Sequence, residues 1–465
     1  MAGFTHVCLV AAMWLTIFSA LVASVPVAGD STFSASVLSS LKRRGHVDPR
    51  VQYMRTLAKY NIPVPEKLRK IATSKMAKAS AKDTSPYSNP AIAEEDDLYF
   101  IAPVGIGSPP QVLYMDFDTG SSDSWVFSTD TATSEVQGQS LWDPRKSSTA
   151  ELVPNTTWQI IYGDFSSSSG IVYKDTLTLG GVVINNMTIE SAQEVSDEFS
   201  KEFKMSGLLG LAWPSIAETT PVQDVLLQYL GEVLKTPLFT ADLRHNSDKG
   251  SYNFGYIDHS LHGSEIQYID IDNSEGFWGV QMTGYAISGQ DVRYEFSTPK
   301  SVIVDTGTTL LYAPDSAVED YFRAVPSANF SEDAYGYILP CNATPPDFIW
   351  EIGDATGERI VGRVPGGYIA YQSLSDIIGE DEPIEPWMDG QCYAGLQSLG
   401  GFSTPEGILG DIWLKAGFSV FDVGNKKYGS APKPLDATNR KLGHYRQTRF
   451  PSHARRRLWC RLLGG

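Results

Sequence analysis

The chain reads Tyr114-Met115-Asp116-Phe117-Asp118-Thr119-Gly120-Ser121 at one point and Val302-Ile303-Val304-Asp305-Thr306-Gly307-Thr308 at another. In each copy an apolar run leads into Asp-Thr-Gly, and Ser or Thr follows the glycine. A single Asp-Thr-Gly is typical of a surface turn, and chance places one in roughly one of ten chains of this length. Two copies in the same context indicate two lobes of similar plan.

A second signature is repeated downstream of each Asp-Thr-Gly. It reads Leu208-Leu209-Gly210-Leu211 after the first copy and Ile408-Leu409-Gly410-Asp411 after the second. The chain between them is rich in Gly, Ser and Thr, with β-branched and aromatic residues in short runs, which is typical of β-structure. Because 465 residues are too many for one compact core, we predict a mainly β fold of two lobes.

Hydrophobic periodicity predicts several individual elements. Residues 111–127 alternate apolar and polar side chains, as expected of strands. Residues 158–164 and 170–179 have the pattern of a hairpin with a Ser-rich tip. Helical segments are predicted at residues 33–70, 222–234 and 315–325, the last with Asp315 as its N-cap.

The two Asp-Thr-Gly turns suit acid–base chemistry once they face each other. The glycine of each motif permits close approach of the backbone, so two carboxyl groups can meet. At such a distance both cannot ionise, and the pair holds one proton. The ionised member takes a proton from water while the protonated member donates to a carbonyl oxygen. We therefore predict Asp118 and Asp305 as a catalytic pair for peptide hydrolysis, with Ser121 and Thr308 orienting their carboxyl groups.

Charge and hydropathy divide the chain. Residues 1–90 contain 12 Lys and Arg against 4 Asp and Glu, residues 433–465 contain 9 against 1, and the acidic body between them contains 16 against 49. We predict a signal peptide at 1–24, a basic prosegment and linker at 25–84, an N-terminal lobe at 85–285, a C-terminal lobe at 286–432 and a basic extension at 433–465.

The acidic body and the N-terminal apolar run limit which partners the protein can bind and where it can be located. A body this acidic does not bind nucleic acid through phosphates, and its self-repulsion is relieved in acid. The apolar run from Val7 to Val25 is followed by no stop-transfer charges, so it favours a signal peptide over a membrane anchor. We expect a secreted, extracellular protein without a stable membrane anchor, acting as a monomer.

Four cysteines and four sequons fit an oxidising compartment. Cys341 and Cys392 lie in the body and form a plausible disulfide, with two buried thiols as the alternative. CxxC spacing and His–Cys clusters are absent from the sequence, so neither a metal nor another cofactor is predicted. Glycosylation sequons occur at Asn155, Asn186, Asn329 and Asn342.

Over residues 99–432 the chain resembles the fungal pepsin-like aspartic endopeptidases of the aspergillopepsin and penicillopepsin group. The resemblance rests on Phe117 to Ser122 with Trp125, on Tyr162-Gly163-Asp164, on Gly207 to Ala212, on Gly276-Phe277-Trp278, on Val304 to Thr309 and on Ile408 to Ile412. It implies a bilobal pepsin-like fold, two β-rich lobes with the active-site cleft between them, and a Cys341–Cys392 disulfide. It also implies protein and peptide substrates and a precursor that is activated in acid.

The resemblance further implies which residues surround the catalytic pair. Tyr162 would lie on a hairpin flap over the cleft and hydrogen-bond Trp125. Lys59-Tyr60 resembles a prosegment pair that approaches the catalytic carboxyl groups, so the prosegment would act as an intramolecular inhibitor. The implied flap and substrate-binding residues are Trp125, Tyr162, Gly163, Asp164, Gly120 and Gly307.

The sequence departs from the family pattern in places, and two competing functions have to be considered. Phe165 stands where related flaps carry a small residue, and Asp164 either accepts a substrate Lys or stabilises its turn. A catalytically silent binding protein would lack one of the two aspartates, and both are present. A membrane-tethered processing protease would need an anchor, which the sequence does not indicate.

Overall fold

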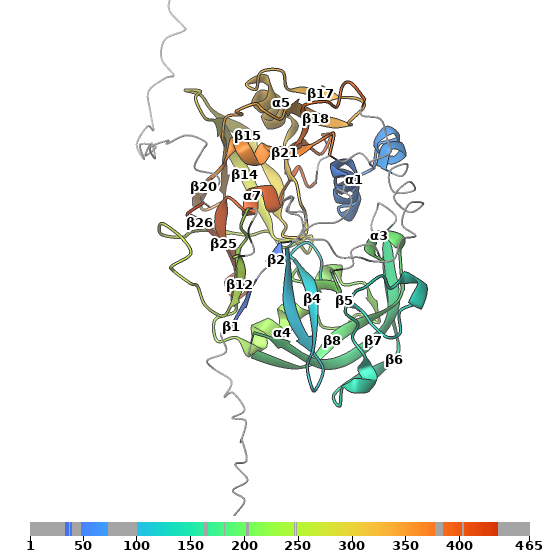
Figure 1. Ribbon diagram of the computed structural model, residues 1–465. Coiled ribbons are helices and arrows are strands. Elements are labelled where there is room, and N and C mark those ends of the chain that lie inside the picture. Colours follow the sequence, from blue (N-terminus) through green and yellow to red (C-terminus); the bar gives the residue numbers. More distant parts are fainter. Residues whose placement is uncertain are drawn as a thin grey trace, which may run out of the picture.

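The computed structural model describes residues 33–36, 38–39, 48–72, 100–161, 166–180, 182–200, 204–245, 247, 249–376, 385–401 and 404–435. The predicted signal peptide, nearly all of the linker, the flap residues 162–165 and all but the start of the basic extension lie outside these ranges. In Figure 1 the N-terminal strands (cyan and green) fill the lower half of the view, and most of the C-terminal strands fill the upper half.

The first lobe is built on a nine-stranded sheet with the order β10-β6-β7-β8-β5-β9-β4-β3-β2. An additional pairing joins β3 to β7, so the strands from β7 round to β3 form a closed ring that removes most free edges. Its strands are β2 Leu38–Ser39, β3 Phe100–Ile106, β4 Gln111–Asp118, β5 Ser124–Phe127, β6 Glu151–Ile161, β7 Ser167–Leu179, β8 Val182–Val195, β9 Gly207–Gly210 and β10 Thr219–Thr220.

The predicted hairpin is present as β6 and β7. Trp158 lies opposite Gly170 and Ile161 opposite Ser167. Thr156 and Trp158 are buried whereas the residues between and after them are exposed, which is the alternation expected of a half-buried strand. β7 begins at Ser167, so Ser167 to Ser169, which were predicted as part of the tip, lie in the strand.

The second lobe contains a seven-stranded and a four-stranded sheet, with the orders β20-β19-β14-β15-β24-β16-β23 and β17-β18-β22-β21. The strands of the larger sheet are β14 Gly279–Ile287, β15 Arg293–Val304, β16 Leu311–Ala313, β19 Phe348–Gly353, β20 Arg359–Val364, β23 Leu396–Ser398 and β24 Gly407–Leu409. Those of the smaller sheet are β17 Asn329–Ser331, β18 Gly336–Pro340, β21 Ala370–Ser373 and β22 Gln391–Ala394.

A six-stranded sheet joins the two halves of the chain, with the order β1-β12-β11-β25-β26-β13. It combines β1 Phe33–Ser36, β11 Leu238–Asp242, β12 Ser251–Phe254 and β13 Gln267–Asp270 with β25 Gly417–Asp422 and β26 Lys427–Pro432. The predicted lobe boundary after residue 285 falls inside β14, which pairs with β15 and β19 on its two sides. All of β14, including the residues before 285, therefore belongs to the larger sheet of the second lobe.

The N-terminal segment begins with strands rather than with the predicted helix. β1 pairs with β12 and β2 pairs with β3, so both extend edges of sheets that the body provides. Ser34 is exposed and Ala35 is buried, which fits a strand period of two. Helical structure starts only at α1 Pro49–Lys59, where Asp48 caps the first turn by accepting from the Arg50 N–H at 3.0 Å.

The remaining helices are short and lie between strands. Those predicted at 222–234 and 315–325 are present as α4 Leu226–Val233 and α5 Asp315–Arg323, although Pro314 rather than Asp315 is the N-cap of α5. Further helical residues are 66–72, α3 Asp197–Ser200, α6 Gly366–Ile369 and α7 Asp411–Leu414, with 3-10 turns at Thr133–Glu135, Pro144–Lys146 and Pro214–Ile216.

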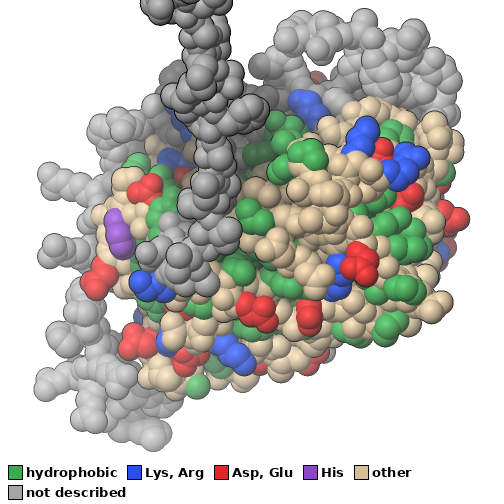
Figure 2. Space-filling model, turned by 90° about the horizontal axis from the view of Figure 1, so that it is seen from below, with side chains coloured by type: hydrophobic (Ala, Val, Ile, Leu, Met, Phe, Trp, Pro, Cys, Tyr) green, Lys and Arg blue, Asp and Glu red, His purple; other side chains and the backbone are tan. Residues whose placement is uncertain are grey.

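The core is continuous through both lobes and the joining sheet. One cluster of buried apolar residues extends from Phe100 in β3 to Tyr428 in β26. On the face shown in Figure 2, charged side chains are scattered, with hydrophobic side chains between them. Among the described helices, none combines the length and the apolar character needed to span a bilayer.

Candidate active site

The two Asp-Thr-Gly turns meet where the two lobes face each other. Asp118 is the last residue of β4 and Asp305 directly follows β15. Each strand is paired in parallel with the repeated apolar signature, so Asp118 lies opposite Gly210 and Val304 lies opposite Leu409. The exposed fractions of Asp118 and Asp305 are 2% and 0%, so both carboxyl groups are removed from solvent.

The glycine of each repeated apolar signature packs against the neighbouring turn. A Cβ added at Gly210 would lie 2.4 Å from the carbonyl carbon of Ser122, and one at Gly410 would lie 2.3 Å from the carbonyl oxygen of Thr308. Both distances are far inside van der Waals contact, so only glycine fits. This explains why the second motif is repeated together with the first.

The glycines of the Asp-Thr-Gly turns allow the two carboxyl groups to meet. A Cβ at Gly120 would lie 2.6 Å from Asp305 Oδ1, and one at Gly307 would lie 2.2 Å from Asp118 Oδ1. Each glycine N–H also donates to the aspartate of its own turn, at 2.8 Å for Gly120 and 2.9 Å for Gly307. The two carboxyl groups therefore face each other across the two turns, close enough for each to influence the pKa of the other.

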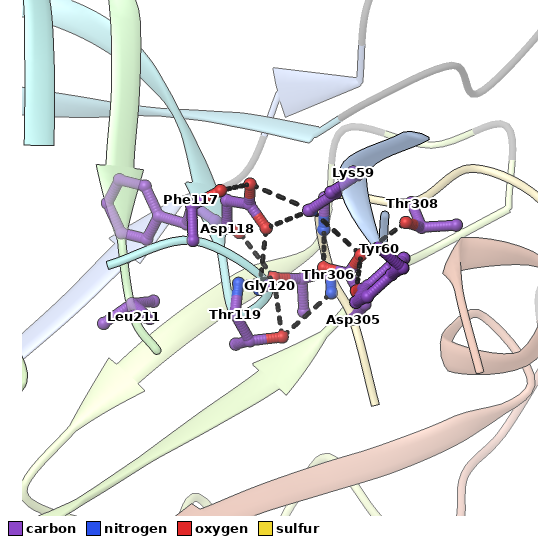
Figure 3. Close-up of polar contacts among 12 residues, drawn as sticks. Lys59, Tyr60, Phe117, Asp118, Thr119, Gly120, Leu211, Asp305, Thr306 and Thr308 are labelled. Atoms are coloured by element: carbon purple, nitrogen blue, oxygen red, sulfur yellow. Dashed lines mark hydrogen bonds and ion pairs between the residues drawn. The ribbon is translucent and has the colours of Figure 1, made fainter. Parts of the chain in front are cut away.

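Ser121 and Thr308 occupy matching positions beside the pair. The Ser121 hydroxyl donates to Asp118 Oδ2 at 2.5 Å, and the Thr308 hydroxyl donates to Asp305 Oδ2. The structure thus places both predicted orienting residues in contact with the carboxyl groups, and Figure 3 shows Thr308 beside Asp305.

Thr119 and Thr306 connect the two turns to each other, a role that the sequence reading did not assign. The Thr119 N–H donates to Thr306 Oγ1 and the Thr306 N–H donates to Thr119 Oγ1, each at 3.0 Å. Each hydroxyl then donates to a carbonyl of the opposite strand, Thr119 to Val304 and Thr306 to Phe117. Both threonines recur at the same place in the repeat, and this recurrence is the sequence signal that could have identified their role.

Lys59 from the end of α1 lies between the two carboxyl groups. Its Nζ donates to Asp118 Oδ1 at 2.8 Å, to Asp118 Oδ2 at 3.0 Å and to Asp305 Oδ2 at 2.9 Å. The hydroxyl of Tyr60 donates to Asp305 Oδ2 at 2.7 Å, and its ring packs on Phe277 at 5.1 Å between centroids. Figure 3 shows both side chains directed at the aspartates.

Burial and the ammonium of Lys59 shift the two carboxyl groups in opposite directions. Burial raises the pKa of Asp118 above its ordinary value, against the opposing charge of Lys59. For Asp305, burial is outweighed by Lys59 and by hydrogen bonds from Asp118, Thr308 and Tyr60, which together lower its pKa to about 2. The two carboxylates in turn raise the pKa of Lys59 despite its burial, so the ammonium stays charged.

Of the predicted flap and substrate-binding residues, three lie outside the described residues, namely Tyr162, Gly163 and Asp164. Trp125 is fully buried and stacks on Trp158 at 6.1 Å between ring centroids. Its indole N–H has no hydrogen-bond partner among the residues that the structure describes.

The structure also describes the predicted cysteine and glycosylation positions. Cys341 and Cys392 form a disulfide, and Cys392 lies in β22 opposite Leu339 of β18. Within the described ranges, no three His, Cys, Asp or Glu side chains are grouped in a way that could hold a metal ion. All four sequon asparagines are exposed, namely Asn155, Asn186, Asn329 and Asn342.

Comparison with known proteins agrees with this geometry. Residues 99–433 match the family model of the eukaryotic aspartyl proteases. Endothiapepsin from Cryphonectria parasitica is 40% identical over 369 residues, which cover 79% of this chain and 83% of that protein. Aspergillopepsin-1 from Aspergillus clavatus is 38% identical over 390 residues, covering 84% and 89%. Penicillopepsin-1 from Talaromyces stipitatus is 36% identical over 402 residues, covering 86% and 93%.

These relatives are aligned along most of their own length as well as most of this chain. The matched family region contains both Asp-Thr-Gly turns and both repeated apolar signatures. The chain therefore belongs to the eukaryotic aspartyl protease family and is an aspartic-type endopeptidase.

Proposed function

We propose that the chain is the secreted precursor of an acid-acting endopeptidase, in which Asp118 and Asp305 activate the water that attacks the peptide bond. The observation that carries this proposal is the meeting of two buried carboxyl groups across the two turns, each oriented by its own Ser or Thr. Protein and peptide chains are the substrates, and Trp125, Gly120 and Gly307 line the site together with the flap residues Tyr162, Gly163 and Asp164.

The proposed chemistry follows from one proton shared by two acids. The ionised carboxylate accepts a proton from a water held between the pair, and the resulting nucleophile attacks the carbonyl carbon. The protonated carboxyl group donates to the carbonyl oxygen, so charge does not build up on it. Proton return to the leaving nitrogen restores the pair, and no covalent enzyme intermediate is required.

We also propose that residues 25–84 act as an intramolecular inhibitor. Lys59 and Tyr60 occupy the positions beside the carboxyl groups where water and a substrate carbonyl would bind. The contact continues as an apolar cluster in which Tyr53, Met54 and Leu57 of α1 pack with residues of the second lobe. The Tyr53 ring lies 5.4 Å from that of Tyr312, and its hydroxyl donates to the carbonyl of Ser398.

The inhibitory contact depends on pH in a definite direction. The pKa of Asp305 is about 2 in the folded precursor, below the ordinary 3.8. Its pairing with Lys59 is therefore fully stabilising above about pH 4 and is lost as pH falls towards 2, a change of ~2 kcal/mol. A fall in pH thus weakens the binding of the N-terminal segment to the catalytic pair, which fits activation of a precursor in acid.

The other features of the proposal concern processing and location. A signal peptide at 1–24 directs secretion, the Cys341–Cys392 disulfide is compatible with an oxidising compartment, and the exposed sequon asparagines are available for glycosylation. The mature lobes extend from the linker to about residue 432, and the enzyme acts as a monomer.

Incubating the purified precursor across a pH series tests this function. We expect conversion in acid, a new N-terminus between about Lys78 and Ala91, and hydrolysis of an unfolded protein only after conversion. A pepsin-type mimic with a hydroxyl in place of the hydrated carbonyl should inhibit the converted form. Full hydrolytic activity of the intact precursor at neutral pH would contradict the proposal.

A further inference from the structure

A second pair of buried carboxyl groups lies behind the turn that carries Asp118. Asp123 directly precedes β5, and Glu190 is in the middle of the neighbouring parallel strand β8, opposite Trp125. Their exposed fractions are 3% and 2%, so neither reaches solvent. The catalytic scheme uses neither residue.

The two side chains line the same small cavity. Glu218 donates its backbone N–H to Asp123 Oδ1 at 2.8 Å. Glu190 Oε2 receives no hydrogen bond from any donor in the described part of the chain. Two carboxyl groups that are buried on one cavity wall do not readily both ionise, which indicates a proton on one of them.

The part of the chain that the structure describes offers no cation that would allow both groups to ionise. Among the described residues, neither carboxyl is paired with a Lys, Arg or His. The facing charges are the exposed carboxylate of Glu218 and the side chain of Asp224, which lines the small cavity beside the pair. The ammonium of Lys174 instead donates to Thr188 Oγ1 at 2.7 Å and to the hydroxyl of Tyr229.

The pair belongs to a set of hydrogen-bonded contacts that hold the Asp118 turn in place. Ser122 Oγ donates to the carbonyl of Trp213, and the Ala212 N–H donates to the carbonyl of Ser121 at 2.9 Å. Asp123 adds to this set by its contact with the Glu218 N–H. Residues 118–124 are thus tied to residues 210–218 by side chains as well as by backbone.

We propose that Asp123 and Glu190 are positioning residues that share a proton, and that this shared proton holds the Asp118 turn in place until both groups ionise. Complete ionisation puts two adjacent buried negative charges behind the turn and drives them apart. The pair would thereby set the upper pH limit of the folded site. The importance of the turn for catalysis rests on the proposed function, whereas the shared proton does not.

The direction of the pH dependence follows from burial. Burial raises the pKa of Asp123 to about 6 and that of Glu190 well above its ordinary value. The folded chain therefore binds more protons than the unfolded chain once pH exceeds about 4. Stability contributed by the pair is complete below that pH and is lost as pH rises through 6 and beyond, opposite to the behaviour of Asp305.

Infrared spectroscopy of the full chain at pH 7 tests for the shared proton directly. The wild type should show the carbonyl band of a protonated buried carboxyl group, and Glu190→Gln should lose one such band. Glu194→Gln is the matched control, because Glu194 is exposed on the same strand and the charge change is identical. An unchanged band in Glu190→Gln would overturn the proposal.

Urea unfolding of the same proteins from pH 5.5 to 8 gives the second readout. A proton retained only in the folded state makes the unfolding constant rise up to about tenfold per pH unit, and Glu190→Gln should flatten this dependence by about one proton. Glu194→Gln should follow the wild type. Equal pH dependence in all three proteins would contradict the proposal.

Asp123→Asn tests the same contact from the other side if Glu190→Gln does not fold. The asparagine keeps an acceptor for the Glu218 N–H and supplies a permanent donor to Glu190, so the protonated band should again be lost. These measurements require no hydrolysis. A precursor that never cleaves peptides would overturn the proposed function and leave the shared proton standing.

Discussion

At the residue scale, the active site depends on close contacts that only particular side chains permit. Gly307 lies against the opposite catalytic carboxyl group, since a Cβ there would be 2.2 Å from Asp118 Oδ1. The sequence identified the glycines as part of the motif. It could not show that each glycine makes room for the aspartate of the other lobe, because that contact joins residues far apart in the chain.

Gly307→Ala should therefore abolish most hydrolysis while leaving a folded protein. The added methyl group displaces Asp118, and a displacement of about 1 Å costs roughly a hundredfold in rate. Gly231→Ala is the control, because nothing lies within 4 Å of a Cβ at that position in α4. Comparison of kcat/KM for one peptide checks both variants, and near-normal activity of Gly307→Ala would contradict the geometry.

Asp164 provides a residue-scale prediction about specificity. A carboxylate at Asp164 would favour Lys before the scissile bond, because the Lys stem can pack on apolar walls while its ammonium reaches the acid. Asp164→Ser should lower kcat/KM about ten- to a hundredfold for a peptide with Lys there, and little for its Phe counterpart. Equal losses on both peptides would assign Asp164 to the turn alone.

At the element scale, the N-terminal segment shows which helices and strands can be predicted from the local sequence. The positive charge and helical periodicity predicted α1, and family resemblance singled out Lys59-Tyr60. Neither predicted that residues 33–39 form strands, because β1 and β2 exist only by pairing with edges of β12 and β3. A strand of two to four residues has no stable structure by itself, so its signal is absent from the local sequence.

Lys59→Met should shift acid conversion of the precursor to higher pH, by about one unit, because the variant keeps the apolar stem and removes the ion pairs with both aspartates. Lys67→Met is a suitable control, since Lys67 pairs with Glu332 at an exposed site where ion pairs contribute ~0–1 kcal/mol. The N-terminus formed at each pH is read by mass spectrometry. Conversion of Lys59→Met at the wild-type pH would argue against Lys59 as the acid-sensitive restraint.

At the scale of the whole molecule, the repeated motif predicted two lobes but not the sheet that joins them. That sheet takes strands from residues 238–270 and 417–432, and their pairing follows from the assembled fold rather than from any local pattern. The boundary drawn at residue 285 therefore divided β14. The cysteine pairing was open on sequence grounds and became definite only with the fold.

The Cys341–Cys392 disulfide closes a loop of 51 residues in the second lobe. Replacing both cysteines by alanine should lower the free energy of unfolding by about 4 kcal/mol on the chain-entropy estimate. Urea unfolding with and without reductant measures this, and the alanine variant should be insensitive to the reductant. A loss well under 1 kcal/mol would show that the loop is held by its packing instead.

The central claim is that Asp118 and Asp305 act together as one catalytic pair. The most direct measurement is peptide hydrolysis in acid by Asp118→Asn and by Asp305→Asn, each converted to the mature form by added wild-type enzyme that is then removed. Each variant should bind the transition-state mimic weakly, keep its fold by circular dichroism and lose at least about a thousandfold in kcat, because neither aspartate alone can both hold and accept the proton. A well-folded single variant that retains wild-type activity would contradict the account.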